Sequence, residues 1–185
     1  MKNNEMTGIK KTVVTALMTA LAVVLPMAFH SIPNGGSIFC PMHLPVLLCG
    51  LACGPFYGAA AGILGPVFSS LLTGMPGPAY LPTMVVELFA YGLFAGLFMK
   101  LFRTGHLYAD LYISLFLSML IGKIAAGAAR ALIFARGHYT FASWFTGYFV
   151  TALPGLALQL ILIPSIVFAL EKAGLIPARY PQKEA

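Results

Sequence analysis

The sequence has little charge. Asp, Glu, Lys and Arg together make up 9% of its 185 residues. A soluble domain is usually about one quarter charged, so a water-soluble fold of this chain would lack the polar surface that it needs. Hydrophobic residues make up 59% of the chain, and the mean hydropathy is +0.89. This composition is typical of a protein whose outer surface contacts lipid. The sequence therefore predicts an all-α, polytopic membrane protein.

The sequence also lacks the motifs of common catalytic sites. It contains no HExxH, GxSxG or Walker motif, and its only aspartate is Asp110, near an expected helix end. Catalysis inside a membrane would need a nucleophile or a metal cluster, and neither is evident. We therefore predict that the chain is not an enzyme and holds no metal or cofactor.

Cysteine is scarce as well. Cys40, Cys49 and Cys53 are an odd number for disulfides, and the last two are four residues apart, which is the wrong pattern for a zinc site. We interpret them as small apolar packing residues. The net charge of +6 comes from basic residues at the ends of apolar runs rather than from one patch, so we predict no nucleic-acid partner.

Apolar runs separated by turn residues predict a compact bundle of six transmembrane helices. A span needs about 20 apolar residues, and six spans use nearly the whole chain. We expect one transmembrane domain over residues 10–176, between tails at residues 1–9 and 177–185. The expected spans cover residues 12–30, 43–53, 56–72, 82–100, 108–135 and 141–170. The second is short unless Pro41 to His43 also lie at membrane depth.

The distribution of basic residues predicts the orientation. With the N-terminus inside, the outer loops carry only Arg136, whereas the inner segments carry Lys2, Lys10, Lys11, Lys100, Arg103, Lys172, Arg179 and Lys183. Cytoplasmic loops are enriched in Lys and Arg, so we predict that both termini are cytoplasmic. Four aromatic residues then fall near the outer interface and are expected to form an aromatic belt: Tyr80, Tyr139, Trp144 and Tyr148.

Small residues recur at helical spacing in several spans. Ala16 and Ala20 form a smooth groove on the first helix, where another helix can approach closely. The partner is either a second protein or another helix of the same bundle, and the spacing alone favours the latter. The pairs Gly58/Gly62 and Gly92/Gly96 are interpreted as internal packing.

Charged residues inside the spans are the main candidates for a binding site. Burying a charge in a bilayer costs at least about 2.5–3.5 kcal/mol, so Glu87, Lys123 and Arg130 should face the interior and find partners. By depth, the expected pair is Glu87 with Arg130. These charges either line an outward-facing pocket or form a structural ion pair. Gln159, in the middle of the sixth span, either lines the same pocket or binds nearby backbone.

The loop after the first span is rich in turn residues. Asn34, Gly35, Gly36 and Ser37 can lie close over a ligand, because glycine allows close backbone approach. His43 stands at the outer end of the second span. It is either a ligand-binding residue or an interfacial anchor.

Three runs, together with the six-span layout and the Ala16/Ala20 pair, resemble the substrate-binding S components of energy-coupling factor (ECF) transporters. The runs are His43–Gly50, Ser69–Pro76 and Glu87–Gly92, and the last includes Tyr91. The resemblance implies a subunit of the bacterial cytoplasmic membrane that binds a vitamin or other micronutrient with high affinity from outside. It also implies a transmembrane coupling subunit, which Ala16 and Ala20 would contact, and two cytosolic ATPase subunits that use ATP. Residues 34–37 would form the lid of the outer pocket.

The substrate-binding candidates stay physical predictions, because binding residues in this family vary with the substrate. They are His43, Glu87, Tyr91, Lys123, Arg130 and Gln159. Two cations and one anion favour a carboxylate-bearing vitamin such as pantothenate, and a zwitterion that uses Glu87 and Arg130 stays open. The alternatives to an importer subunit are a self-sufficient facilitator or channel and a structural membrane subunit.

Overall fold

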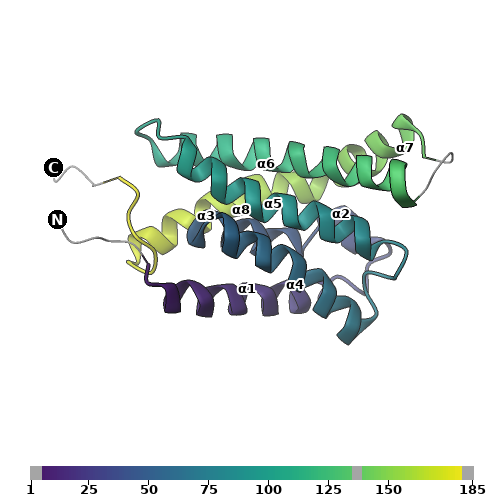
Figure 1. The fold of residues 1–185 in the computed structure, drawn as a ribbon, viewed down its shortest axis with the longest axis horizontal. Helices are drawn as coiled ribbons and strands as arrows, with labels where there is room; N and C mark the ends of the chain where they lie inside the picture. Colours follow the sequence, from purple (N-terminus) through teal and green to yellow (C-terminus); the bar gives the residue numbers. More distant parts are fainter. Residues whose placement is uncertain (1–5, 135–138, 181–185) are drawn as a thin grey trace.

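The computed structural model describes residues 6–134 and 139–180, and it is a bundle of helices that run along one long axis (Figure 1). In chain order the elements are α1 (Gly8–Met27), α2 (Gly35–Phe39), α3 (His43–Cys53), α4 (Pro55–Thr73), α5 (Leu81–Leu101), α6 (Leu107–Ala129), the π-helix η1 (Arg130–Phe134), α7 (Phe141–Phe145), the π-helix η2 (Thr146–Thr151) and α8 (Leu153–Lys172).

The described residues contain six segments that are long and apolar enough to cross a membrane, which confirms the predicted number of spans. They are α1, the α2–α3 pair, α4, α5, α6 with most of η1, and α8. Large apolar side chains on the outside of the bundle, such as Leu71, Phe116 and Ile161, are exposed in the isolated chain. These side chains suit contact with lipid tails.

The second span is a broken helix. Its two parts, α2 and α3, are separated at Cys40, whose φ of 47° lies in the left-handed region. Almost all of α3 is buried inside the bundle, between α1, α4, α5 and α8. Irregular backbone is tolerated at membrane depth when protein surrounds it. The break therefore places the start of α3, at His43, in the protein interior.

Glycines allow α3, α4 and α5 to pack with their backbones in contact. A Cβ atom on Gly58 would lie 2.4 Å from the carbonyl oxygen of Gly92, and one on Gly92 would lie 2.0 Å from that of Gly58. No other residue fits such an approach, which small residues favour in membrane helices. The predicted packing role of these glycines is confirmed.

The last span begins later than the sequence predicted. Residues 141–151 form α7 and η2 rather than the start of a straight helix, and α8 begins at Leu153. Pro154 favours a new helix start at this point, because its fixed φ suits the first turn and its missing N–H cannot continue the preceding helix. The fifth span, expected to end at Ala135, reaches Phe134 as η1. Ala135 and Arg136 lie outside the described residues.

The start of α1 and the end of α8 lie at the same end of the bundle (Figure 1). Lys10 and Lys11 lie in the first turns of α1, and Lys100 and Lys172 in the last turns of α5 and α8. We call the end of the bundle that carries these lysines the basic end. The end that carries α2 and α7 is called the opposite end (Figure 1).

Part of the predicted C-terminal tail is attached to the bundle. The side chains of Arg179 and Tyr180 fold back onto the start of α6 and bind Asp110. Residues 1–5 and 181–185, which complete the two predicted tails, lie outside the described residues.

Candidate functional site

The carboxylate of Glu87 lies at the centre of a buried polar cluster. Its Oε1 atom accepts a hydrogen bond from the Tyr91 hydroxyl at 3.1 Å. The same oxygen lies 3.5 Å from His43 Nε2 and 3.6 Å from Lys123 Nζ. All four side chains are at most 6% exposed. The structure thus brings together four of the predicted binding residues, from α3, α5 and α6.

Local sequence explains how these side chains meet. Glu87 and Tyr91 are four residues apart on α5 and therefore share one face. The His43 ring, at the start of α3, meets the Tyr91 ring edge-on with 5.2 Å between the centroids. Gly122 provides room for this arrangement, since a Cβ there would lie 2.1 Å from Tyr91 Cδ1. Lys123 follows Gly122 directly on α6.

The ammonium group of Lys123 is surrounded by aromatic rings as well as by Glu87. Its Nζ lies 5.4 Å from the centroid of the Tyr148 ring, 5.8 Å from that of Phe149 and 6.0 Å from that of Tyr91. Ring faces attract a cation, and the attraction is greater where water is excluded. The Lys123 ammonium group therefore contacts one carboxylate and three rings.

Two polar atoms in this region have no hydrogen-bond partner. Gln159 of α8 donates from Nε2 to the carbonyl oxygen of Cys40, at 3.3 Å, but its Oε1 atom is buried without a partner. The Nδ1 atom of His43 is likewise buried and unpartnered. Buried polar atoms nearly always have a partner in native proteins, and ordered water or a ligand supplies the missing ones. The cluster therefore has unused hydrogen-bonding capacity.

Arg130 does not pair with Glu87, and that expectation was wrong. Its guanidinium lies over the rings of Tyr80 and Tyr139, at 4.8 and 5.4 Å from their centroids. Arg130 stands seven residues beyond Lys123, about 10 Å further along a helix axis, so it lies closer to the opposite end. Lys123 takes its place beside Glu87.

The predicted lid residues lie at the start of α2. Asn34, Gly36 and Ser37 are exposed, whereas Gly35 is buried against the backbone of Phe29. The helix itself packs on α8, since a Cβ on Gly155 would lie 2.6 Å from the carbonyl oxygen of Phe39. The lid role stays a prediction.

Ala16 and Ala20 lie on the exposed face of α1, where Val13, Leu17 and Val24 are exposed as well. In the isolated chain neither alanine is buried by a neighbouring helix, so the groove is open to a second protein. The docking role itself stays a prediction.

Sequence reasoning missed three aromatic contributors to the site. Trp144 donates from Nε1 to the carbonyl oxygen of Lys123 at 3.0 Å, and Tyr148 and Phe149 cover its ammonium group. The sequence placed Trp144 and Tyr148 in an aromatic belt. The available signal was an intramembrane lysine followed by an aromatic-rich segment, because a buried cation favours aromatic neighbours.

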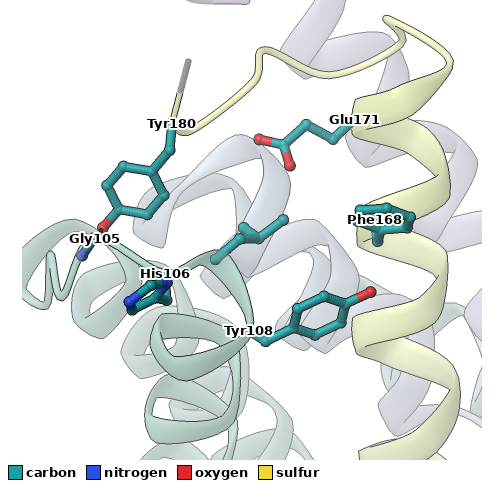
Figure 2. A pocket seen from close by; sticks show the side chains of 7 residues that line it. Gly105, His106, Tyr108, Phe168, Glu171 and Tyr180 are labelled. Carbon is teal, nitrogen blue, oxygen red and sulfur yellow. Dashed lines mark hydrogen bonds between the residues drawn. The ribbon is translucent and has the colours of Figure 1, made fainter. Parts of the chain in front are cut away.

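Two shallow cavities lie at the basic end rather than at Glu87. One, of about 240 Å³, lies between the start of α6 and Phe168, Glu171 and Tyr180 (Figure 2). The other, of about 270 Å³, lies beside it, between the C-terminal segment and the ends of α3 and α5. Within the described part of the chain no group of three or more His, Cys, Asp or Glu residues could hold a metal ion.

The family model "ECF transporter, substrate-specific component" matches residues 10–175, which is most of the chain. The search of curated proteins and the search of solved structures each gave no match.

Proposed function

The chain belongs to the family of ECF transporter substrate-specific components, and from this premise we propose that it binds a carboxylate-bearing, water-soluble vitamin or related micronutrient at the Glu87 cluster. The observation that supports the site is the buried group of His43, Glu87, Tyr91 and Lys123, beside two unpartnered polar atoms. Ionisable groups inside a membrane are costly to bury, which makes them candidates for a functional site.

The chemistry of the cluster favours a ligand with one carboxylate and several hydroxyl or amide groups, as in pantothenate. An incoming carboxylate would share Lys123 with Glu87 and gain a charge-assisted hydrogen bond. Hydroxyl or amide N–H groups would donate to Gln159 Oε1, and His43 Nδ1 would take a further polar group. A zwitterion would instead separate Glu87 from Lys123 and bind each of them.

We propose the following arrangement in the membrane. The basic end faces the cytoplasm of a bacterial cell, and the opposite end receives the ligand, with residues 34–37 as a lid. The exposed alanines of α1 contact a transmembrane coupling subunit, and two cytosolic ATPase subunits supply the energy. The chain itself uses no ATP and performs no catalysis. A channel would need a continuous polar path, whereas the Glu87 cluster is closed and nearly fully buried.

A thermal-shift screen of the detergent-purified chain against water-soluble vitamins and their precursors tests the ligand assignment. A ligand that binds only the folded state stabilises it by RT ln(1 + [L]/Kd), about 4 kcal/mol at a thousandfold excess over Kd. We expect one carboxylate-bearing compound to raise the Tm of the wild type but not of the double variant Glu87→Gln/Lys123→Met, which lacks the cation. No shift with any compound, from a protein shown to be folded, would contradict the proposed ligand class.

The docking assignment is tested separately by enlarging the α1 groove. Ala20→Leu should prevent co-purification with the coupling subunit and abolish uptake, because close helix approach needs a small residue. It should leave the ligand-induced Tm shift unchanged. Ala28→Leu is the matched control, since Ala28 is also exposed but lies after the last turn of α1. Normal uptake with Ala20→Leu would contradict the docking role.

A further inference from the structure

Residues Phe141–Thr151, which form α7 and η2, cover the site on the side of Lys123. We call them the cover segment. Tyr148 and Phe149 of this segment place their rings 5.4 and 5.8 Å from Lys123 Nζ. Lys123 is only 2% exposed, and these two rings provide part of that burial. Access to the ammonium group from this side therefore requires the cover segment to move.

One hydrogen bond connects the cover segment to the backbone of α6. The indole N–H of Trp144 donates to the carbonyl oxygen of Lys123, at 3.0 Å. The ring lies directly against Gly127, where a Cβ would come within 2.2 Å of Nε1. Trp144 thus binds α6 at Lys123, whose side chain enters the site. The position of the indole ring depends on Gly127, one turn later on α6.

The rest of the cover segment is weakly packed. No residue of α7 or η2 is buried, and Phe141, Phe145 and Val150 are mostly or half exposed. Its second half is a π-helix, and α6 also ends in a π-helix. Such turns are rare and occur frequently at functional sites. Few buried contacts give a segment a low free energy of local opening.

We propose that the cover segment opens to admit the ligand to Lys123, and that Trp144 holds it closed. This inference rests on the proposed function, because it gives the Glu87 cluster an entrance. It differs from the predicted lid at residues 34–37, which lies on another element and packs on α8. With the segment open, the Tyr148 and Phe149 rings leave Lys123, and a carboxylate takes their place. On closure the two rings contact the ligand and limit its size.

The test measures how often Lys123 becomes accessible without any ligand. The protein, in lipid nanodiscs at pH 8.5, is treated with the water-soluble acylating reagent sulfo-NHS acetate. Peptide mass spectrometry gives the acylation rate of Lys123, with the exposed Lys100 as internal reference. The variant Trp144→Phe keeps a ring against Gly127 but removes the N–H donor. We expect it to raise the Lys123 rate at least fivefold and to leave the Lys100 rate and the Tm nearly unchanged.

Two further variants complete the design. Gly127→Ala displaces the indole without changing it and should also raise the Lys123 rate. Phe116→Leu removes an exposed ring from another part of α6 and should have no effect. Equal Lys123 rates in the wild type, Trp144→Phe and Gly127→Ala would overturn the proposal, as would acylation that occurs only with global unfolding. Because no ligand is used, that result would leave the vitamin-binding proposal intact. A vitamin screen without any Tm shift would, in turn, leave the proposal about the cover segment intact.

Discussion

Two buried carboxylates at different depths of the bundle are held in different ways. Asp110, near the basic end, is fully buried, and each of its two carboxylate oxygens accepts two short hydrogen bonds. Its Oδ1 accepts from the backbone N–H and the hydroxyl of Thr104 at 2.9 and 2.8 Å. Its Oδ2 accepts from Arg179 Nε at 2.6 Å and from the Tyr180 hydroxyl at 2.5 Å. Glu87, by contrast, has three longer contacts of 3.1–3.6 Å, all on Oε1.

Under the proposed function, this difference distinguishes a structural ion pair from a ligand-binding site. The Asp110 cluster joins the start of α6 to the C-terminal segment, and Tyr180 accepts from the backbone of Gly105 as well (Figure 2). Arg179 also donates to Glu171 and to the carbonyl oxygen of Phe102. Both carboxylate oxygens of Asp110 are thus occupied by hydrogen bonds within the protein. The Glu87 cluster has longer contacts beside two unpartnered atoms, and under the proposed function a ligand replaces some of these contacts.

The largest effect is expected from breaking the Glu87 pair on one side only. Lys123→Met leaves Glu87 buried without its cation, and removing one partner of a buried pair costs about 3–5 kcal/mol. The double variant Glu87→Gln/Lys123→Met should recover most of that free energy of unfolding, yet bind no ligand. Denaturant titration in mixed micelles measures the stability, and the ligand-induced Tm shift measures binding. A double variant as unstable as the single one would show that the two charges are not coupled.

A smaller loss of stability is expected at the basic end. Asp110→Asn removes the charge that faces Arg179 and should cost about 2 kcal/mol, because hydrogen bonds to charged groups contribute about 1.5–3 kcal/mol each. Ligand binding should be unchanged. Glu171→Gln is the control. Its carboxylate accepts a hydrogen bond from the backbone N–H of Arg179, and a glutamine side-chain oxygen can accept the same bond. Loss of ligand binding in Asp110→Asn would remove the distinction between the two clusters.

Gln159 should affect binding more than folding. Gln159→Leu removes a donor to Cys40 and a free acceptor, and we expect a loss of about 1 kcal/mol in stability. Ligand affinity should fall about tenfold, since one lost hydrogen bond to a ligand costs about the same free energy. Isothermal titration with the compound found in the screen measures the affinity. An unchanged Kd would place Gln159 outside the binding site.

The smallest effect is expected from Arg130, which lies further toward the opposite end and is half exposed. Arg130→Ala should slow the association of an anionic ligand about threefold at low salt, and the difference should disappear at 1 M salt, where charges are screened beyond about 3 Å. Stopped-flow measurement of Trp144 fluorescence follows the association. Arg103→Ala, at the basic end, is the control. A salt-independent change in the dissociation rate would instead place Arg130 in direct contact with the bound ligand.

The sequence predicted the number of spans and the burial of Glu87 and Lys123, because both follow from the cost of polar groups in lipid. It also identified His43, Glu87, Tyr91 and Lys123 as candidates, and the structure brings them together. It did not predict the buried ion pair of Asp110 with Arg179. Pairing was harder to predict. Glu87 and Arg130 were matched by depth alone, whereas the direction of each side chain around its helix decides which atoms meet. The break at Cys40 and the π-turn of η2 depend on tertiary packing, and neither has a strong local signal in the sequence.

The most direct test compares the two carboxylates in one experiment. Wild type, the double variant Glu87→Gln/Lys123→Met and Asp110→Asn are each heated with and without the vitamin identified in the screen. We expect Asp110→Asn to have a lower Tm but to keep the full ligand-induced shift, whereas the double variant should keep a Tm near that of the wild type and lose the shift. A full shift in the double variant, together with a lost shift in Asp110→Asn, would contradict this expectation and move the binding site to the basic end.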